Sequence, residues 1–154
     1  IYGPYGTYDG GREKAPAALC RKVIIAKKEN KNKIEVWGDG KQTRTFLYVD
    51  DCIEGTLRLF QSDYSEPVNI GSDEQVSFNQ MIEIIENISG IKKLERIYQL
   101  DKPKGVRGRS SDNTFVKKNV GWEPKYNLKQ GLELTYNWIF DELKNPINTG
   151  KFGR

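Results

Sequence analysis

Strand-like and helix-like patterns alternate along this 154-residue chain, and the alternation restricts its fold more than any single motif does. Short apolar runs typical of strands are separated by longer segments with apolar residues at helical spacing. These strand-like runs cover residues 34–37, 43–49, 68–70 and 94–100. The alternation predicts an α/β fold. The strands are too few for a complete nucleotide-binding sheet, and none is followed by a glycine-rich GxGxxG loop that would hold a dinucleotide.

Helices are expected between these strands, and some of their ends are marked in the sequence. Ser77 and Gln80 form a capping-box pattern at the start of one helix, and Gly90 is its expected stop. Asp50 or Asp51 is expected to cap another, although adjacent carboxylates are also compatible with acid/base chemistry. The expected helices run over 16–28, from the Asp pair through 60, 77–90, 113–120 and 128–144.

Composition excludes several classes of function. The chain has 25 Lys and Arg against 21 Asp and Glu, and its net charge of +4 suits an anionic ligand. Because the basic residues are dispersed among acids, no nucleic-acid partner is expected. With no His and two distant cysteines, Cys20 and Cys52, no metal site is expected, and both are interpreted as buried thiols of a cytoplasmic protein. The three tryptophans, Trp37, Trp122 and Trp138, are expected in a core or an interface.

The ends of the chain indicate how it is organised. It opens at Ile1 without an initiator Met, inside an apparent strand-to-loop junction, which predicts a truncated chain. Residues 1–145 are expected to form one domain, followed by a loose tail over 146–154. No apolar run approaches the roughly 18 residues of a transmembrane helix, so no membrane partner is expected.

Several segments carry a family resemblance in the same order along the chain. WGDGKQTRTFLYVDD (37–51), EPVNIGSDE (66–74) and VGWEPKYNLKQGLELT (120–135) resemble the C-terminal half of the extended short-chain dehydrogenases/reductases that act on nucleotide-diphosphate sugars. GGREKAPAALCRK (10–22) and GVRGRSSDN (105–113) are similar in particular to the GDP-mannose 3,5-epimerases.

The resemblance implies a two-part enzyme of Rossmann type, of which this chain is the C-terminal substrate-binding part. The N-terminal NAD-binding portion, with the family's Tyr-x-x-x-Lys pair and catalytic Cys, is absent from the chain. The parent is implied to be a homodimeric isomerase that converts GDP-mannose to GDP-L-galactose by NAD-dependent C4 oxidation, 3,5-epimerisation and re-reduction. The chain by itself is therefore expected to be inactive.

The resemblance also assigns roles near the start of the chain. Lys14 is implied to be the catalytic acid or base opposite the missing Cys, and Glu13 to hydrogen-bond sugar hydroxyls. Tyr2 and Pro4 lie in the YGP segment that is implied to meet the nicotinamide of NAD. An ordinary solvated Arg-Glu-Lys triplet at 12–14 is the alternative interpretation.

A diphosphate favours arginine, because the guanidinium fork donates two parallel charge-assisted hydrogen bonds. Arg44, Arg107 and Arg109 are the candidates, and the resemblance places Arg44 and Arg109 at phosphates and Gln42 at the nucleotide. It also implies that Lys22 reaches the phosphates. Each has an alternative: the arginines flank turns at the surface, Arg107 orients a nearby acid, and Lys22 extends its ammonium to solvent.

Two other functions stay open at this point. One is a UDP- or dTDP-sugar 4-epimerase or 4,6-dehydratase, which would have no need of the Glu13-Lys14 pair together with Arg109. The other is a sugar-nucleotide-binding module without activity of its own.

Overall fold

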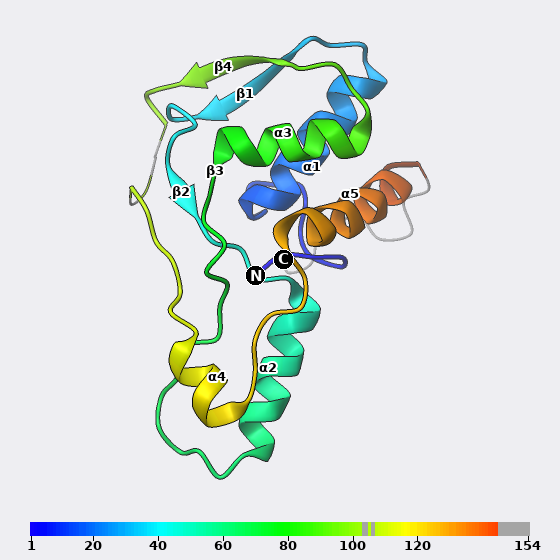
Figure 1. The fold of residues 1–154 in the computed structure, drawn as a ribbon. Coiled ribbons are helices and arrows are strands. Elements are labelled where there is room, and N and C mark those ends of the chain that lie inside the picture. The colour runs from blue at the N-terminus through cyan, green and yellow to red at the C-terminus, as the bar shows by residue number, and fades with distance from the viewer. Residues whose placement is uncertain (103–104, 106, 145–154) are drawn as a thin grey trace.

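The computed structural model describes residues 1–102, 105 and 107–144, so the predicted tail over 146–154 lies outside the described residues. Helices and strands alternate along most of the chain (Figure 1). Their order is α1 (Ala15–Lys28), β1 (Lys33–Trp37), β2 (Thr43–Arg44), α2 (Val49–Gln61), β3 (Val76–Ser77), α3 (Phe78–Ser89), β4 (Glu95–Gln99), α4 (Thr114–Val120) and α5 (Leu128–Lys144). None of the helices in this described part is long and apolar enough to cross a membrane.

The strands form two small sheets. β1 and β4 are parallel, with Lys33 opposite Glu95 and Trp37 opposite Gln99, and β2 pairs antiparallel with β3. A parallel strand pair needs a long crossover, and here the chain between β1 and β4 includes α2 and α3. The predicted α/β class is confirmed.

The main core lies where α1, α3 and α5 pack together beneath β1 (Figure 1). β1 alternates, with Ile34 and Val36 buried on the helix side and its other residues exposed, as a strand with one covered face does. Residues that are at least 99% buried dominate this core, and each fully buried apolar side chain contributes about 1.5–3 kcal/mol. They are Cys20, Val23, Val36, Met81, Ile82, Ile85, Leu132 and Ile139.

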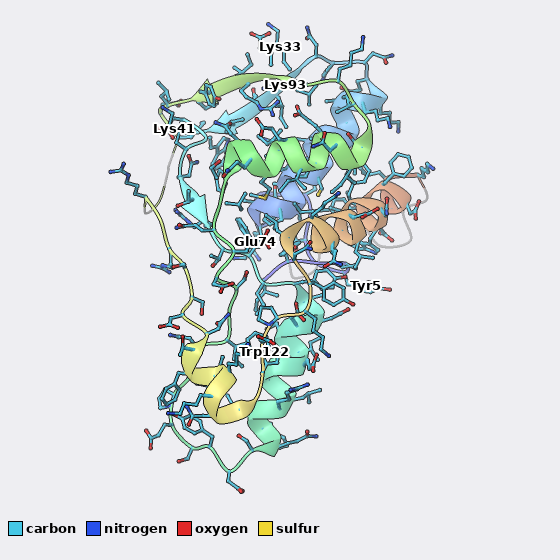
Figure 2. All side chains as sticks on the ribbon, in the orientation of Figure 1. Tyr5, Lys33, Lys41, Glu74, Lys93 and Trp122 are labelled. Carbon is cyan, nitrogen blue, oxygen red and sulfur yellow. The ribbon has the colours of Figure 1, made fainter. Side chains whose placement is uncertain are left out.

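A second core of Leu47, Val116 and Trp122 lies between α2 and α4, with Val68 and Ile70 packed against it. Figure 2 labels Trp122 in this position. The other tryptophans differ: Trp138 packs partly buried against the main core, whereas Trp37 at the end of β1 is 51% exposed. Trp122 and Trp138 are thus core residues, as predicted, and Trp37 lies outside both cores.

The predicted limits of α3 are confirmed by its end contacts. Ser77 Oγ accepts from the Gln80 backbone N–H at 3.2 Å, and the Ser77 N–H donates to Gln80 Oε1 at 2.9 Å. These two bonds satisfy donors that a helix start leaves unpaired. Gly90 ends the helix at φ +68°, a conformation that glycine adopts without steric cost.

Two predicted strands differ from the structure. The run at 43–49 is a strand only over Thr43–Arg44, because Tyr48 instead forms an isolated parallel bridge with Tyr2 and α2 begins at Val49. The run at 68–70 is not a strand, since it has no ladder partner in the part of the chain that the structure describes. Its apolar side chains are used in the second core.

The predicted cap at Asp50 or Asp51 is wrong. The N-cap residue of α2 is Tyr48, two or three residues earlier than expected, and it makes no side-chain cap bond. Asp51 is 1% exposed, and its two oxygens accept from the backbone N–H groups of Lys125 and Tyr126, each at 3.0 Å. The carboxylate therefore joins α2 to the segment that leads into α5.

Candidate functional site

The loop before α1 is held by a cluster of charges that includes a predicted site residue. Glu13 Oε2 accepts from the Gly11 N–H at 2.7 Å, and Glu13 Oε1 lies 3.5 Å from Arg21 Nη2. Arg21 also reaches Asp9, with 3.3 Å between Nη1 and Oδ1. Gly10 and Gly11 have φ of +94° and +86°, which glycine alone adopts readily. The loop is therefore shaped by two glycines and closed by Arg21.

Sequence reasoning missed Arg21, although a signal was present. Arg21 lies eight residues after Glu13, and helical side chains lean toward the N-terminus of their helix. A cation in the second turn of α1 can therefore reach back to acids in the loop that precedes it. Its Nε is buried without a partner among the described residues, while its terminal nitrogens lie beside Asp9 and Glu13.

Lys14 differs from Glu13 in its surroundings. It is the N-cap residue of α1, where its carbonyl accepts from the Ala18 N–H at 3.0 Å, and its side chain is exposed. The ammonium is thus displayed at the entrance of α1.

The YGP segment takes part in the core through Tyr2. Its ring is 5% exposed and packs edge-on against Phe46 and Tyr48, and its hydroxyl donates to the Leu128 carbonyl at 3.3 Å. Burial raises the pKa of Tyr2. Pro4 follows in a turn and is partly exposed. Of this pair, only Pro4 presents side-chain surface to a ligand, and the predicted cofactor role of both stays a prediction.

Lys22 is directed to the sheet. Its ammonium donates to the Glu35 carbonyl on β1 at 3.0 Å, and burial lowers the pKa of Lys22, an effect that Glu35 opposes. It lines a shallow hollow with Lys31, Lys33 and other residues of α1, β1 and β4. Gln42 and Arg44 do not line this hollow. The structure therefore does not bring Lys22 together with the candidate arginines.

Gln42 is buried at 5% exposure and has one unused acceptor. Its Nε2 donates to the Trp37 carbonyl at 2.8 Å, whereas its Oε1 is buried without a hydrogen-bond partner in the described residues. A buried amide oxygen without a donor is costly. The chain itself covers this oxygen, so it offers no open surface to a ligand in this arrangement, and the predicted contact of Gln42 with the nucleotide stays a prediction.

Arg44 and Arg107 lie on adjacent segments. The Thr43 N–H donates to the Arg107 carbonyl at 3.0 Å, so the stretch at 107 runs beside β2. Arg44 Nη2 comes within 3.0 Å of where a Cβ on Gly105 would lie, and Arg44 Nη1 donates to the Thr43 carbonyl at 2.6 Å. Glycine at 105 therefore leaves room for the Arg44 guanidinium.

Arg109 continues the same exposed stretch. It lies between Arg107, which is tied to β2, and Ser111, whose N–H donates to the Ser72 carbonyl at 3.4 Å. The structure thus brings the backbone of Arg107 beside β2, next to Arg44, and Arg109 follows two residues later on the same exposed stretch. Guanidinium groups on such neighbouring segments can bind a planar, multiply charged anion.

The cysteines take no part in either group. Cys20 is fully buried in the main core, where burial raises the pKa of its thiol, and Cys52 is partly buried beside the second core. The prediction of buried thiols is confirmed for Cys20, and Cys52 is only partly covered. Both thiols are free.

Comparison with known proteins identifies the family to which this chain is similar. Residues 4–135 match the family described as GDP-mannose 4,6 dehydratase. The chain is 51% identical over 150 residues to a GDP-mannose 3,5-epimerase of Arabidopsis thaliana. That match takes in 97% of this chain and 38% of the relative, so the chain spans about two fifths of the length of this relative.

Solved structures agree with the fold. The chain is similar to a UDP-glucose 4-epimerase of Thermotoga maritima determined with UDP-glucose, with a TM-score of 0.81 and 30% identity, over 92% of this chain and 44% of that one. A UDP-glucuronic acid 4-epimerase of Bacillus cereus, determined with UDP-glucuronic acid and NAD, matches with a TM-score of 0.72 and 30% identity. Here the match covers 92% of this chain and 43% of that one.

Proposed function

The chain belongs to the family described as GDP-mannose 4,6 dehydratase, and on that premise we propose that it is the substrate-binding part of a longer GDP-mannose 3,5-epimerase. The observation that carries the proposal is the 51% identity to such an epimerase over 97% of the chain. The two UDP-sugar 4-epimerases of known structure described above are 30% identical. Sequence similarity therefore favours the GDP-mannose reaction over a UDP-sugar 4-epimerase.

In this proposal the arginines beside β2 hold the diphosphate. Arg44 and Arg107 lie on paired segments, and Arg109 follows on the same exposed stretch. Two phosphates offer several acceptor oxygens, which guanidinium groups from separate segments can clamp from more than one direction. Gln42, which lies beside Thr43 at the start of β2, is proposed to contact the nucleotide.

NAD fits this chain only at one edge. The turn after Tyr2 would supply Pro4 as a neighbour of the nicotinamide, while the glycine-rich loop that binds a dinucleotide has no counterpart in the sequence. When bound, NAD would accept and return the hydride of sugar C4. The residues of this chain would bind the sugar and transfer protons at C3 and C5.

Lys14 is proposed to move those protons. A ketone at C4 makes the hydrogens on C3 and C5 acidic, and inversion needs a base on one face of the ring and an acid on the other. Lys14 is exposed at the entrance of α1, where the helix dipole stabilises negative charge that develops on the sugar oxygen. Glu13 is held by Gly11 and Arg21, so its backbone fixes the position of Lys14 next in sequence.

A homodimeric parent and a cytoplasmic location are parts of the same proposal. The free thiols of Cys20 and Cys52 support a reducing compartment. The chain alone is proposed to be inactive, because the residues for the hydride step would lie in the rest of the parent.

The test is incubation of the full-length protein with GDP-mannose and NAD in heavy water. We expect GDP-L-galactose as product, with deuterium at C3 and C5 in the NMR spectrum, and no equivalent reaction with UDP-glucose. Turnover of UDP-glucose without exchange at C3 or C5 would instead establish a 4-epimerase.

A further inference from the structure

The loop between Tyr8 and Lys14 is fixed at both ends, whereas its middle part is not packed. Tyr8 is 4% exposed, and its ring lies edge-on to Trp138 at a centroid distance of 5.5 Å. At the other end, the Lys14 carbonyl accepts the first hydrogen bond of α1. Between these ends, a Cβ at Gly10 or Gly11 would meet no atom of the described residues within 4 Å. Packing therefore contributes little to the position of the middle of the loop.

Charged side chains hold this part of the loop instead. Arg21 presents one terminal nitrogen to each of two acids, with Nη1 3.3 Å from Asp9 Oδ1 and Nη2 3.5 Å from Glu13 Oε1. Each acid in turn binds a glycine amide. Asp9 Oδ1 accepts from the Gly10 N–H at 2.8 Å, and Glu13 Oε2 accepts from the Gly11 N–H at 2.7 Å. The planar guanidinium can bridge two acids in this way because its donors point in fixed directions.

The two contacts of Arg21 differ in how well they are shielded from water. The side chains of Arg21 and Glu13 are 20% and 13% exposed, whereas that of Asp9 is 54% exposed. Water and salt screen an exposed ion pair strongly and a partly buried pair much less. The contact between Arg21 and Glu13 is therefore the better shielded one, and it acts on the residue directly before Lys14.

We propose that Arg21 is a positioning residue for proton transfer at C3 and C5 of the sugar, and that it acts on Lys14 through Glu13. The inference rests on the proposed 3,5-epimerase function. Helix α1 fixes the backbone of Lys14 on one side, and the contact between Arg21 and Glu13 fixes it on the other. Because the lysine ammonium stands on a flexible four-carbon stem, the position of the backbone decides which atoms it reaches. Loss of Arg21 would therefore release the loop and displace the ammonium from the sugar.

Arg21→Gln in the full-length protein tests this role, because glutamine removes both the charge and the fork. We expect deuterium exchange at C3 and C5 of GDP-mannose, measured by NMR in heavy water, to fall by roughly 10–100-fold, the loss expected when a reacting group is misplaced by about 1 Å. Bound NADH should accumulate as in the unmodified enzyme, because oxidation at C4 does not use Lys14. A merely structural role would lower both signals, and unchanged exchange would disprove the inference.

Two further variants test whether Arg21 acts through Lys14. In the Lys14→Ala enzyme, the addition of Arg21→Gln should cause no further loss of exchange at C3 and C5, and additive losses would contradict the proposal. Arg21→Lys keeps the charge but replaces the fork by one ammonium. It should retain more exchange than Arg21→Gln and less than the unmodified enzyme, with normal NADH. If Arg21→Gln does not fold, this conservative variant decides, and exchange at the unmodified rate would overturn the inference.

The position of the loop can also be measured without turnover. Hydrogen–deuterium exchange of backbone amides over residues 9–14, followed by mass spectrometry, should be several-fold faster in Arg21→Gln, since the Gly11 N–H loses a fixed acceptor. Arg58→Gln on α2 removes another ion-paired arginine and should leave the loop unchanged. A loop released by Arg21→Gln in a protein that never exchanges C3 or C5 would refute the proposed function alone. An active epimerase in which Arg21→Gln alters neither the loop nor the sugar exchange would refute this inference alone.

Discussion

At the residue scale, Glu13 and Lys14 are neighbours in sequence with different surroundings. Both Glu13 oxygens face groups of the chain itself, namely the Gly11 N–H and Arg21, and its side chain is 13% exposed. Lys14 has no side-chain cap bond at the start of α1 and is exposed. Glu13 therefore shapes the loop, whereas the Lys14 side chain is open to solvent and can meet a ligand.

Lys14→Ala in the full-length enzyme should separate the two halves of the reaction. We expect 3,5-epimerisation to fall by roughly 10²–10⁴-fold, the usual contribution of a positioned acid or base. Oxidation at C4 should persist, visible as bound NADH in the absorption spectrum. Lys28→Ala, at the other end of α1, should leave both steps unchanged. Normal deuterium exchange at C3 and C5 in the Lys14 variant would disprove its role.

Arg109→Ala should weaken binding of GDP-mannose much more than binding of NAD. A hydrogen bond to a charged group contributes about 1.5–3 kcal/mol, which corresponds to about tenfold or more in Kd. Isothermal titration calorimetry with each ligand measures this difference, and Lys129→Ala on α5 provides an exposed cation as control. Unchanged affinity for GDP-mannose would exclude the contact.

The candidate site was predictable only in part at this scale. The arginines at 44, 107 and 109 are recognisable because diphosphates favour guanidinium groups, and the structure ties the backbone of Arg107 to β2, next to Arg44. The bonds of Lys22 to β1 and of Arg21 to the acidic loop depend on how α1 lies against its neighbours. Side-chain partners across elements are not encoded in local spacing.

At the scale of elements, Asp51 connects α2 to the approach of α5. Asp51→Ala would remove the acceptor of two backbone N–H groups, those of Lys125 and Tyr126. We expect the free energy of unfolding to fall by roughly 2–3 kcal/mol. Asp50→Ala, one residue earlier but exposed, should change it by less than about 0.5 kcal/mol. Chemical denaturation of both variants measures the contrast, and equal effects would contradict it.

Helix α4 provides a prediction about pH. Asp112 Oδ1 accepts from the Thr114 N–H at 2.9 Å, and this hydrogen bond lowers the pKa of the carboxyl group below its usual value. A lowered pKa in the folded state means that the stabilisation is present above the unfolded pKa of about 3.9 and is lost as pH falls through the folded pKa.

Asp112→Asn should therefore lower the denaturation midpoint at neutral pH by a small amount. The difference from the unmodified protein should shrink as pH is lowered from about 6 to about 2. Denaturant titrations at a series of pH values measure it. If the difference in denaturation midpoint instead grows as the pH falls, the ionised Asp112 carboxylate does not stabilise the folded state.

Helices were predicted more accurately than strands, for a physical reason. The limits of α3 and α5 depend on local signals such as the capping box at Ser77 and a continuous apolar stripe. A strand exists only when a partner is present, and partners are distant in sequence. The runs at 43–49 and 68–70 have strand-like composition, yet most of their residues have no ladder partner in the described chain.

At the scale of the whole molecule, the first residues are locked against the last helix. The Tyr2 hydroxyl donates to the Leu128 carbonyl at 3.3 Å, at the start of α5. The same ring lies on Gly131 so closely that a Cβ there would be 2.1 Å from the Tyr2 hydroxyl oxygen. The YGP segment, with its predicted cofactor contact, is therefore held against α5 through Tyr2 by a hydrogen bond and by close packing.

Gly131→Ala should therefore destabilise the full-length protein, although alanine is the better helix former by about 1 kcal/mol. Because the added methyl group meets the Tyr2 ring, we expect a loss of about 1–3 kcal/mol in the free energy of unfolding. Tyr2→Phe alone should cost about 1 kcal/mol through the lost hydrogen bond. The double variant should be less destabilised than the sum of the two single variants, since phenylalanine removes the oxygen that the methyl group strikes. Denaturant titration of the four proteins gives the coupling energy. A coupling energy of zero would show that Tyr2 and Gly131 do not interact, and it would contradict the contact between the YGP segment and α5.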